Sequence, residues 1–147
     1  MLSLSTKGRY AVRIMVYLTV AENGKPIQKH RISDSEGISQ DYVEQILVKL
    51  KTDGLVTSHR GKKGGFTLGR RPENITVEQV IEAAEGRISI VPCLSSDQCE
   101  RMTMCVTQPV WKEATEALKA SFSAHTIAEL AEQASALRDS APPTYSI

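Results

Sequence analysis

The hydrophobic pattern of the first half of the chain predicts three helices. Apolar residues recur every three or four positions over residues 5–20, and the Asn-Gly-Lys-Pro stretch at 23–26 ends that helix. A shorter helix is expected over residues 28–35, because Gly37 then takes the position after the last turn that glycine favours. Ser39 offers a hydroxyl N-cap for a third helix, whose apolar face consists of Val43, Ile46, Leu47 and Leu50.

The period of the pattern changes after the third helix. Residues 55–59 are rich in β-branched side chains and predict a strand, residues 60–65 are the glycines and bases of a turn, and residues 66–68 predict the returning strand. Together they predict a β-hairpin with a basic, glycine-rich tip. A helix, a short helix, a third helix and a hairpin, in that order, indicate a winged helix-turn-helix.

The second half of the chain is predicted to be helical around one long loop. Thr76 caps a helix through Glu85, with Glu78 and Glu82 outward and an apolar face formed by Val77, Val80, Ile81 and Ala84. Residues 90–108 form a loop that holds all three cysteines, and a loop of this length is often functional. Two further helices are expected at 109–122 and 123–137, the first with Trp111, Ala114, Leu118 and Phe122 at helical spacing.

These elements predict a mainly α fold with a small β-hairpin wing. We expect a winged helix-turn-helix DNA-binding domain over residues 1–75. Residues 76–140 would hold a helix, the cysteine loop and the dimerisation helices. Residues 141–147, which contain two consecutive prolines, are expected to be a flexible tail.

Charge is distributed unevenly, although the net formal charge is only +1. Residues 1–75 carry 13 Lys and Arg against 7 Asp and Glu, whereas the remainder carries 5 against 10. A basic half joined to an acidic half favours a polyanionic partner for the first half. The alternative is a chance distribution of surface charge.

Composition and segment lengths restrict the class of protein. The apolar fraction of 41% and the charged fraction of 24% are near the averages for globular proteins. No apolar run approaches the ~20 residues that span a bilayer, and the N-terminus lacks the apolar core of a signal peptide. We therefore expect a cytoplasmic protein with no membrane partner. Three cysteines without an export signal argue against a disulfide framework and favour metal or redox chemistry.

The second helix of a helix-turn-helix pair enters the major groove, and here that helix begins near Ser39. Glutamine can pair with adenine and glutamate can accept a hydrogen bond from cytosine N4. The exposed residues that we expect to contact DNA are Ser39, Gln40, Tyr42, Glu44 and Gln45. The alternative for any one of them is an ordinary solvated helix residue.

The tip of the predicted hairpin carries Arg60, Lys62 and Lys63. Glycines on both sides let the backbone approach a phosphate closely, so we expect these three cations to supply affinity that does not depend on base sequence. The alternative is a solvated turn, since lysine and glycine are common in turns.

Four motifs resemble the Rrf-two family of winged-helix transcription factors. They are the segments 6–12 (Thr-Lys-Gly-Arg-Tyr-Ala-Val), 42–47 (Tyr-Val-Glu-Gln-Ile-Leu), 54–56 (Gly-Leu-Val) and 60–66 (Arg-Gly-Lys-Lys-Gly-Gly-Phe). The resemblance implies a homodimer held by the long helix after the cysteine loop. It also implies binding to double-stranded DNA at a palindromic operator through the recognition helix and wing. By position, Glu44 falls on a base-reading residue and Arg60 on a wing residue that contacts DNA.

The cysteines Cys93, Cys99 and Cys105 have the spacing C-x5-C-x5-C. Thiolates suit zinc and iron–sulfur clusters, but these gaps are longer than those of a zinc knuckle, and three unliganded thiols are the alternative. Family members that carry a cluster show this spacing, so the resemblance implies an iron–sulfur cluster, [2Fe-2S] or [4Fe-4S], that can be lost when the protein is isolated. Where IscR-like members have a fourth-ligand histidine this chain has Gln108, and where NsrR-like members have an acid from the partner it has Arg9.

We therefore predict a homodimeric transcriptional regulator, not an enzyme, that senses iron–sulfur, redox or nitric-oxide status through a cluster held by three cysteines. One rival is a redox enzyme or electron carrier, for which the sequence supplies no second cofactor motif. The other rival is a winged-helix regulator without a metal, switched by a partner protein or a small ligand. Asp97 and Glu100 lie within the cysteine loop and could supply oxygen ligands, and the alternative is that they are solvated loop acids.

Overall fold

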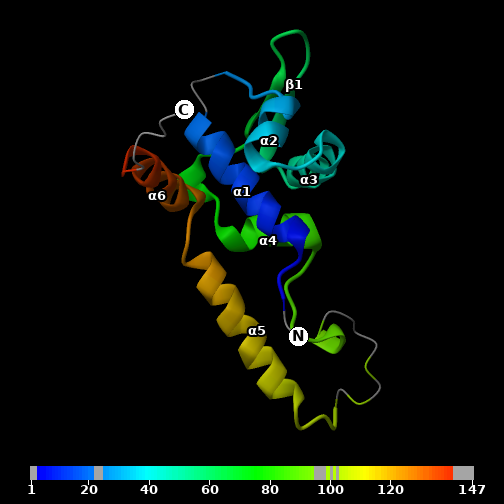
Figure 1. Cartoon of the computed structure of the whole chain (residues 1–147). Coiled ribbons are helices and arrows are strands. Elements are labelled where there is room, and N and C mark those ends of the chain that lie inside the picture. Colours follow the sequence, from blue (N-terminus) through cyan, green and yellow to red (C-terminus); the bar gives the residue numbers. More distant parts are fainter. Residues whose placement is uncertain (1–2, 22–24, 95–98, 100, 102, 141–147) are drawn as a thin grey trace.

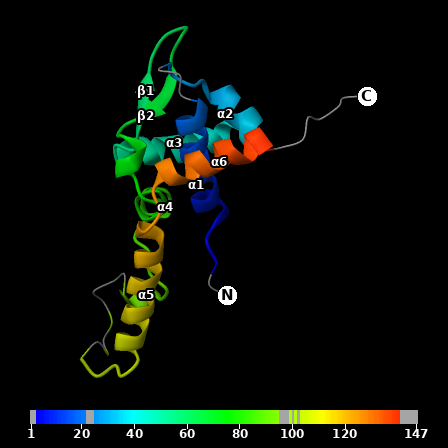
Figure 2. The ribbon, with the colours of Figure 1, turned by 90° about the vertical axis from the view of Figure 1, so that its left-hand side faces the viewer.

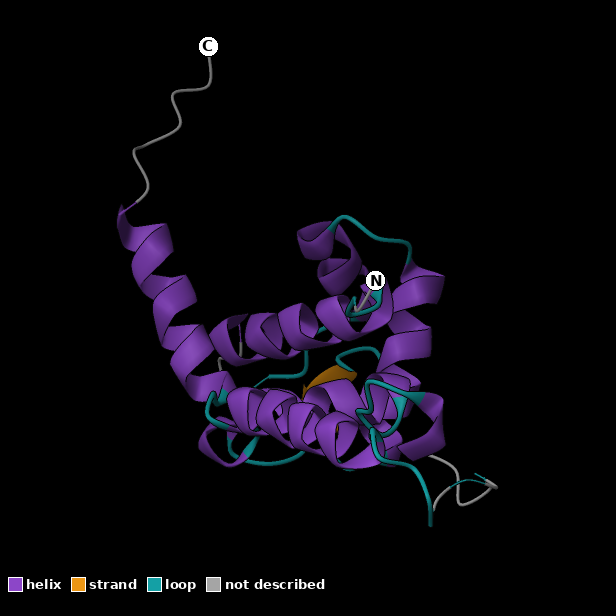
Figure 3. Cartoon of the chain, turned by 90° about the horizontal axis from the view of Figure 1, so that it is seen from below, coloured by secondary structure: helices purple, strands orange, loops and turns teal. Residues whose placement is uncertain are grey.

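The computed structural model describes residues 3–21, 25–94, 99, 101 and 103–140. Asp97, Glu100 and the expected tail at 141–147 lie outside the described residues. The elements in chain order are α1 (Thr6–Ala21), α2 (Lys29–Glu36), α3 (Gln40–Thr52), β1 (Val56–His59), β2 (Gly65–Leu68), η1 (Pro72–Asn74), α4 (Val77–Glu85), η2 (Pro92–Leu94), α5 (Gln108–Ser123) and α6 (Ile127–Ser140). The prediction of a mainly helical chain with one small hairpin is confirmed (Figures 1 and 3).

Local signals account for the helix-turn-helix pair. Gly37 ends α2 in the left-handed conformation, with φ 66°, and its N–H donates to the Ser33 carbonyl at 2.9 Å. Ser39 then caps α3, since its hydroxyl accepts a hydrogen bond from the Tyr42 N–H at 3.2 Å. The predicted apolar face of α3 is fully buried and consists of Val43, Ile46, Leu47 and Leu50.

The hairpin is an antiparallel pair in which Val56 lies opposite Leu68 and His59 lies opposite Gly65. A third segment joins it, because Ile27 pairs with Phe66 through two backbone hydrogen bonds of 2.9 and 2.8 Å. The sequence pattern did not predict this contact. The wing, residues 56–68, is therefore anchored to the segment that leads into α2.

One hydrophobic core unites helices from both halves of the chain. It includes Ile14 of α1, Ile46 of α3, Val80 of α4 and Ile127 of α6, all with no solvent exposure. Figure 2 shows α6 lying across α1. Burial of this apolar surface is what holds the DNA-binding helices and the later helices together. The boundary at residue 75 stays a prediction.

The last helix begins later and ends later than predicted. The expected helix at 123–137 is interrupted after α5, and α6 runs from Ile127 to Ser140. At the junction, Thr126 and Glu129 exchange hydrogen bonds between backbone and side chain, 3.1 and 3.2 Å, as in a capping box. The Thr-x-x-Glu spacing was the sequence signal for this start. Pairing of Thr126 with Thr76 then turns α6 back toward α1.

The expectation that Glu78 and Glu82 point away from the protein was wrong. Both side chains are largely covered because α5 packs beside α4, and Lys119 Nζ lies 3.3 Å from Glu78 Oε1 and 3.5 Å from Glu82 Oε1. Ser123 also donates a hydrogen bond to Glu78. The hydrogen bond to Glu78 and the negative charge of Glu82 raise the pKa of Lys119 above its usual value. These contacts fix how α5 leaves the body of the protein.

Candidate nucleic-acid interface and cysteine segment

The structure brings α2, α3 and the wing to one end of the molecule (Figure 1). Ser39, Gln40, Glu44 and Gln45 are exposed there, as predicted for residues that contact DNA. Tyr42 differs, because it is half-buried and its ring meets Tyr10 edge-on at a centroid distance of 6.1 Å. The Ser39 hydroxyl is exposed but already accepts the hydrogen bond that caps α3. The DNA-contacting role of all five residues stays a prediction.

The wing tip presents three exposed cations. Arg60, Lys62 and Lys63 are all exposed, and none forms a salt bridge within the described part of the chain. A tight turn precedes β2, in which the Gly64 N–H donates to the Gly61 carbonyl at 2.9 Å. Cations left unpaired on a protruding turn are free to approach phosphates.

Two residues at the start of α2 were missed by the sequence analysis. Lys29 Nζ lies 2.6 Å from Glu44 Oε2 of α3. Gln28 Nε2 donates to the backbone carbonyl of Lys62 in the wing at 3.3 Å. No local sequence signal marks either contact, because the partners lie 15 and 34 positions apart.

The cysteines lie toward the other end, in the segment from η2 to the start of α5. Cys93, Cys99 and Cys105 are free thiols, each partly exposed. Cys105 Sγ lies 3.3 Å from Thr107 Oγ1, and this hydrogen bond lowers the pKa of the Cys105 thiol below its usual value. The segment thus supplies soft ligands that are accessible and, at Cys105, more readily ionised.

Three cysteine thiolates are ligands of the type that binds an iron–sulfur cluster, but the structure does not bring them together. Among the described residues, no three His, Cys, Asp or Glu side chains lie close enough together to hold a metal ion. Gln108 is the first residue of α5 and is half-buried, while Arg9 is exposed on α1. Neither side chain is a good iron ligand.

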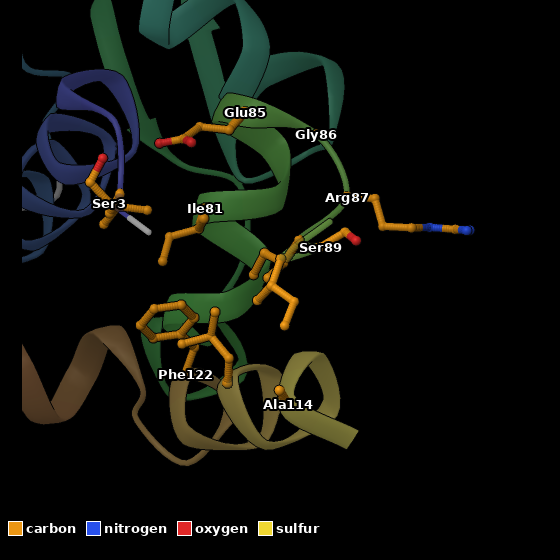
Figure 4. A pocket seen from close by; sticks show the side chains of 12 residues that line it. Ser3, Ile81, Glu85, Gly86, Arg87, Ser89, Ala114 and Phe122 are labelled. Atoms are coloured by element: carbon orange, nitrogen blue, oxygen red, sulfur yellow. The ribbon is translucent and has the colours of Figure 1, made fainter. Parts of the chain in front are cut away.

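A cavity of about 460 Å³ lies between α4, α5 and the N-terminal segment. In Figure 4 the side chains of Ile81, Ala114 and Phe122 line it, while the Glu85 carboxylate points toward the N-terminal residues and Arg87 points away. The lining is mostly apolar and comes from helices on both sides. A cavity of this size and character is suited to a small molecule.

Glu85 connects this region to the first helix. Its Oε1 accepts hydrogen bonds from the Gly8 N–H at 2.9 Å and from Ser5 Oγ at 2.5 Å. On the other side, the Ile90 N–H lies 3.4 Å from Thr115 Oγ1, the buried hydroxyl of α5. These hydrogen bonds join the C-terminal end of α4 to α1 and the segment after α4 to α5.

Comparison with known proteins agrees with this arrangement. Residues 4–133 match the profile of the Rrf2 family, described as "Iron-dependent Transcriptional regulator". The HTH-type transcriptional regulator IscR of Aliivibrio salmonicida is 33% identical over 129 residues, which is 88% of this chain and 77% of that protein.

Two solved structures share the fold along most of their length. The structure of CymR, the global cysteine regulator of B. subtilis, has a TM-score of 0.73 at 33% identity and covers 90% of this chain and 98% of that one. The structure of T. potens IscR has a TM-score of 0.75 at 29% identity and covers 99% and 97%.

These relatives are regulators of transcription and not enzymes, which confirms the prediction made from the motifs. None of the helices that the structure describes is long and apolar enough to cross a membrane. With four matching motifs, a winged helix-turn-helix and a family match over nearly its whole length, the chain belongs to the Rrf2 family of DNA-binding transcriptional regulators.

Proposed function

We propose that this protein is a cytoplasmic, homodimeric regulator that binds a palindromic operator and whose DNA affinity is set by an iron–sulfur cluster at Cys93, Cys99 and Cys105. The observation that carries the proposal is the placement of two chemistries at opposite ends of one packed unit. Exposed cations and the recognition helix lie at one end, and three free thiols lie next to the start of α5. The names of the IscR relatives support the same reading.

Residues 1–75 would act as the DNA-binding part and residues 76–140 as the sensing and dimerising part. Cluster binding at the three cysteines would change the position of α5 and the hydrogen bonds that Glu85 makes to α1. If two states of that segment hold α1 and the recognition helices differently, DNA affinity must differ between them by linkage. The signal would then be iron–sulfur, redox or nitric-oxide status.

Dimerisation through α5 is the first testable part. Val110, Trp111 and Leu118 are exposed on a helix in which only Thr115 is buried, so an apolar stripe is open to a second copy. We expect light scattering to give twice the chain mass, both free and on DNA, and the bound duplex to contain half-sites roughly 34–36 Å apart. A monomer under both conditions would contradict this prediction.

Visible absorbance of anaerobically purified protein tests the cluster. Three thiolates leave one iron position to a weak ligand, since the amide of Gln108 is a poor substitute for imidazole or thiolate. We expect a brown protein that bleaches in air. Gln108→His should bleach more slowly, and Cys99→Ala should be colourless while keeping the dimer, because α5 lies outside the cysteine segment. A full cluster in Cys99→Ala would rule out the three-thiolate site.

A regulator without a metal is the second candidate, and two observations favour it. One is the likeness to CymR, the global cysteine regulator of B. subtilis. The other is the cavity between α4 and α5, which could take a small ligand. In that case anaerobic protein would be colourless and free of iron. Absorbance and iron content measured after anaerobic supply of iron and sulfide therefore separate the two candidates.

A further inference from the structure

The three residues before and at the start of α2 contact both parts of the DNA-reading end. Ile27 pairs with Phe66 of β2 through two backbone hydrogen bonds. Gln28 donates to the Lys62 carbonyl at the wing tip, 3.3 Å away. Lys29 reaches in the other direction and lies 2.6 Å from the Glu44 carboxylate of α3. This short segment therefore joins the wing to the recognition helix.

The contact between Lys29 and Glu44 leaves half of the carboxylate free. Lys29 Nζ binds Oε2, so Oε1 remains available to accept a second hydrogen bond. The Lys29 side chain is 31% exposed and the Glu44 side chain 56% exposed. A pair this open to water contributes little to folding stability. We therefore expect the ion pair to affect DNA binding, because water is displaced from the surface that faces DNA.

Glutamate is a costly residue to bring into the major groove. Its negative charge is repelled by the phosphates on both sides, and the repulsion strengthens as water leaves the interface. A buried charge without a partner also keeps its full desolvation penalty. A lysine already bound to the carboxylate cancels that charge and fixes the side chain before DNA arrives.

We propose that Lys29 is a specificity-determining positioning residue. It neutralises Glu44 and holds the carboxylate so that Oε1 faces a cytosine N4 amine. This proposal rests on the proposed function, because it requires that Glu44 read a base. It adds a residue to the reading surface that lies on α2, outside the recognition helix.

A double-mutant cycle on operator DNA tests the proposal. The probe is the duplex that the parent dimer selects from random DNA, together with variants that replace each cytosine pair in the half-site. The proteins are the parent, Lys29→Met, Glu44→Ala and the double variant, with Lys29→Arg as a rescue and Lys51→Met as a charge-matched control on α3. Within the described part of the chain, Lys51 forms no salt bridge.

We expect the parent to prefer one cytosine pair by at least about fivefold per half-site, as a good base contact does. Lys29→Met should lose that preference and weaken operator binding by about tenfold or more, and Lys29→Arg should retain both. In the Glu44→Ala background, Lys29→Met should cost no more than Lys51→Met, since the charge it neutralises is gone.

Two results would overturn the proposal while leaving DNA reading intact. One is that Lys29→Met lowers operator affinity equally in the parent and in the Glu44→Ala background, and also reduces the salt slope by about 0.9 per contact. Lys29 would then be a phosphate contact. The other is an unchanged cytosine preference in Lys29→Met. A parent that selects no sequence at all would instead refute the proposed operator binding, and this proposal with it. Circular dichroism of each variant confirms that the helices are retained.

Discussion

Replacing Arg60, Lys62 and Lys63 together by alanine is expected to weaken DNA binding and to flatten its dependence on salt. If each cation contacts one phosphate in each half of the proposed dimer, six contacts disappear and the slope of log affinity against log salt falls by about 5. Through those contacts the parent's affinity drops by about a thousandfold between ~50 and ~200 mM salt, and the triple variant should not show that drop. Fluorescence anisotropy across a salt series measures both slopes.

The triple variant should lose affinity for specific and for random duplexes to the same extent, because phosphates carry no sequence information. Single variants should be graded, with Lys62→Ala alone lowering the slope by about 2 in a dimer. Arg138→Ala is the matched control, since it removes one exposed cation from α6 instead of from the wing. An unchanged slope in the triple variant would exclude the wing as an electrostatic contact.

Gly65→Ala is expected to destabilise the protein and displace the wing. Gly65 has a φ of 150°, and an added Cβ would lie 2.4 Å from the Ile27 carbonyl oxygen and 2.6 Å from its carbon. These are backbone atoms, so the clash is relieved only by breaking the pairing between Ile27 and Phe66. Backbone strain together with two lost hydrogen bonds predicts a loss of about 2–4 kcal/mol in the free energy of unfolding. Urea denaturation measures this change.

Gly61→Ala is the matched control for Gly65→Ala. Gly61 also has a positive φ, 102°, in the same hairpin, but an added Cβ would meet no atom within 4 Å. It should therefore carry only the cost of the backbone conformation, about 1–2 kcal/mol, and leave the wing anchored. The loss of unfolding free energy should therefore be clearly larger in Gly65→Ala than in Gly61→Ala. Equal effects of the two substitutions would show that the contact with residue 27 does not position the wing.

The DNA-reading fold was accessible from the sequence because its signals are local. The spacing of apolar residues, the caps at Ser39 and Thr76 and the left-handed glycine at Gly37 each act within one or two helical turns. The start of α6 was predicted wrongly because a local signal was overlooked. Thr126 and Glu129 exchange hydrogen bonds between backbone and side chain, and these bonds begin the helix. The identity of the candidate wing and thiol residues followed from residue type and spacing alone.

Tertiary structure decided which of these residues meet. Lys29 finds Glu44 fifteen positions away, Lys119 covers Glu78 and Glu82, and Ile27 becomes part of the wing. A long polar side chain can reach many partners, and only the packing of its helix against others selects one. The sequence by itself determined the helices, the hairpin and the chemistry available at each end. The folded core, by fixing helix against helix, determined how that chemistry is paired and neutralised.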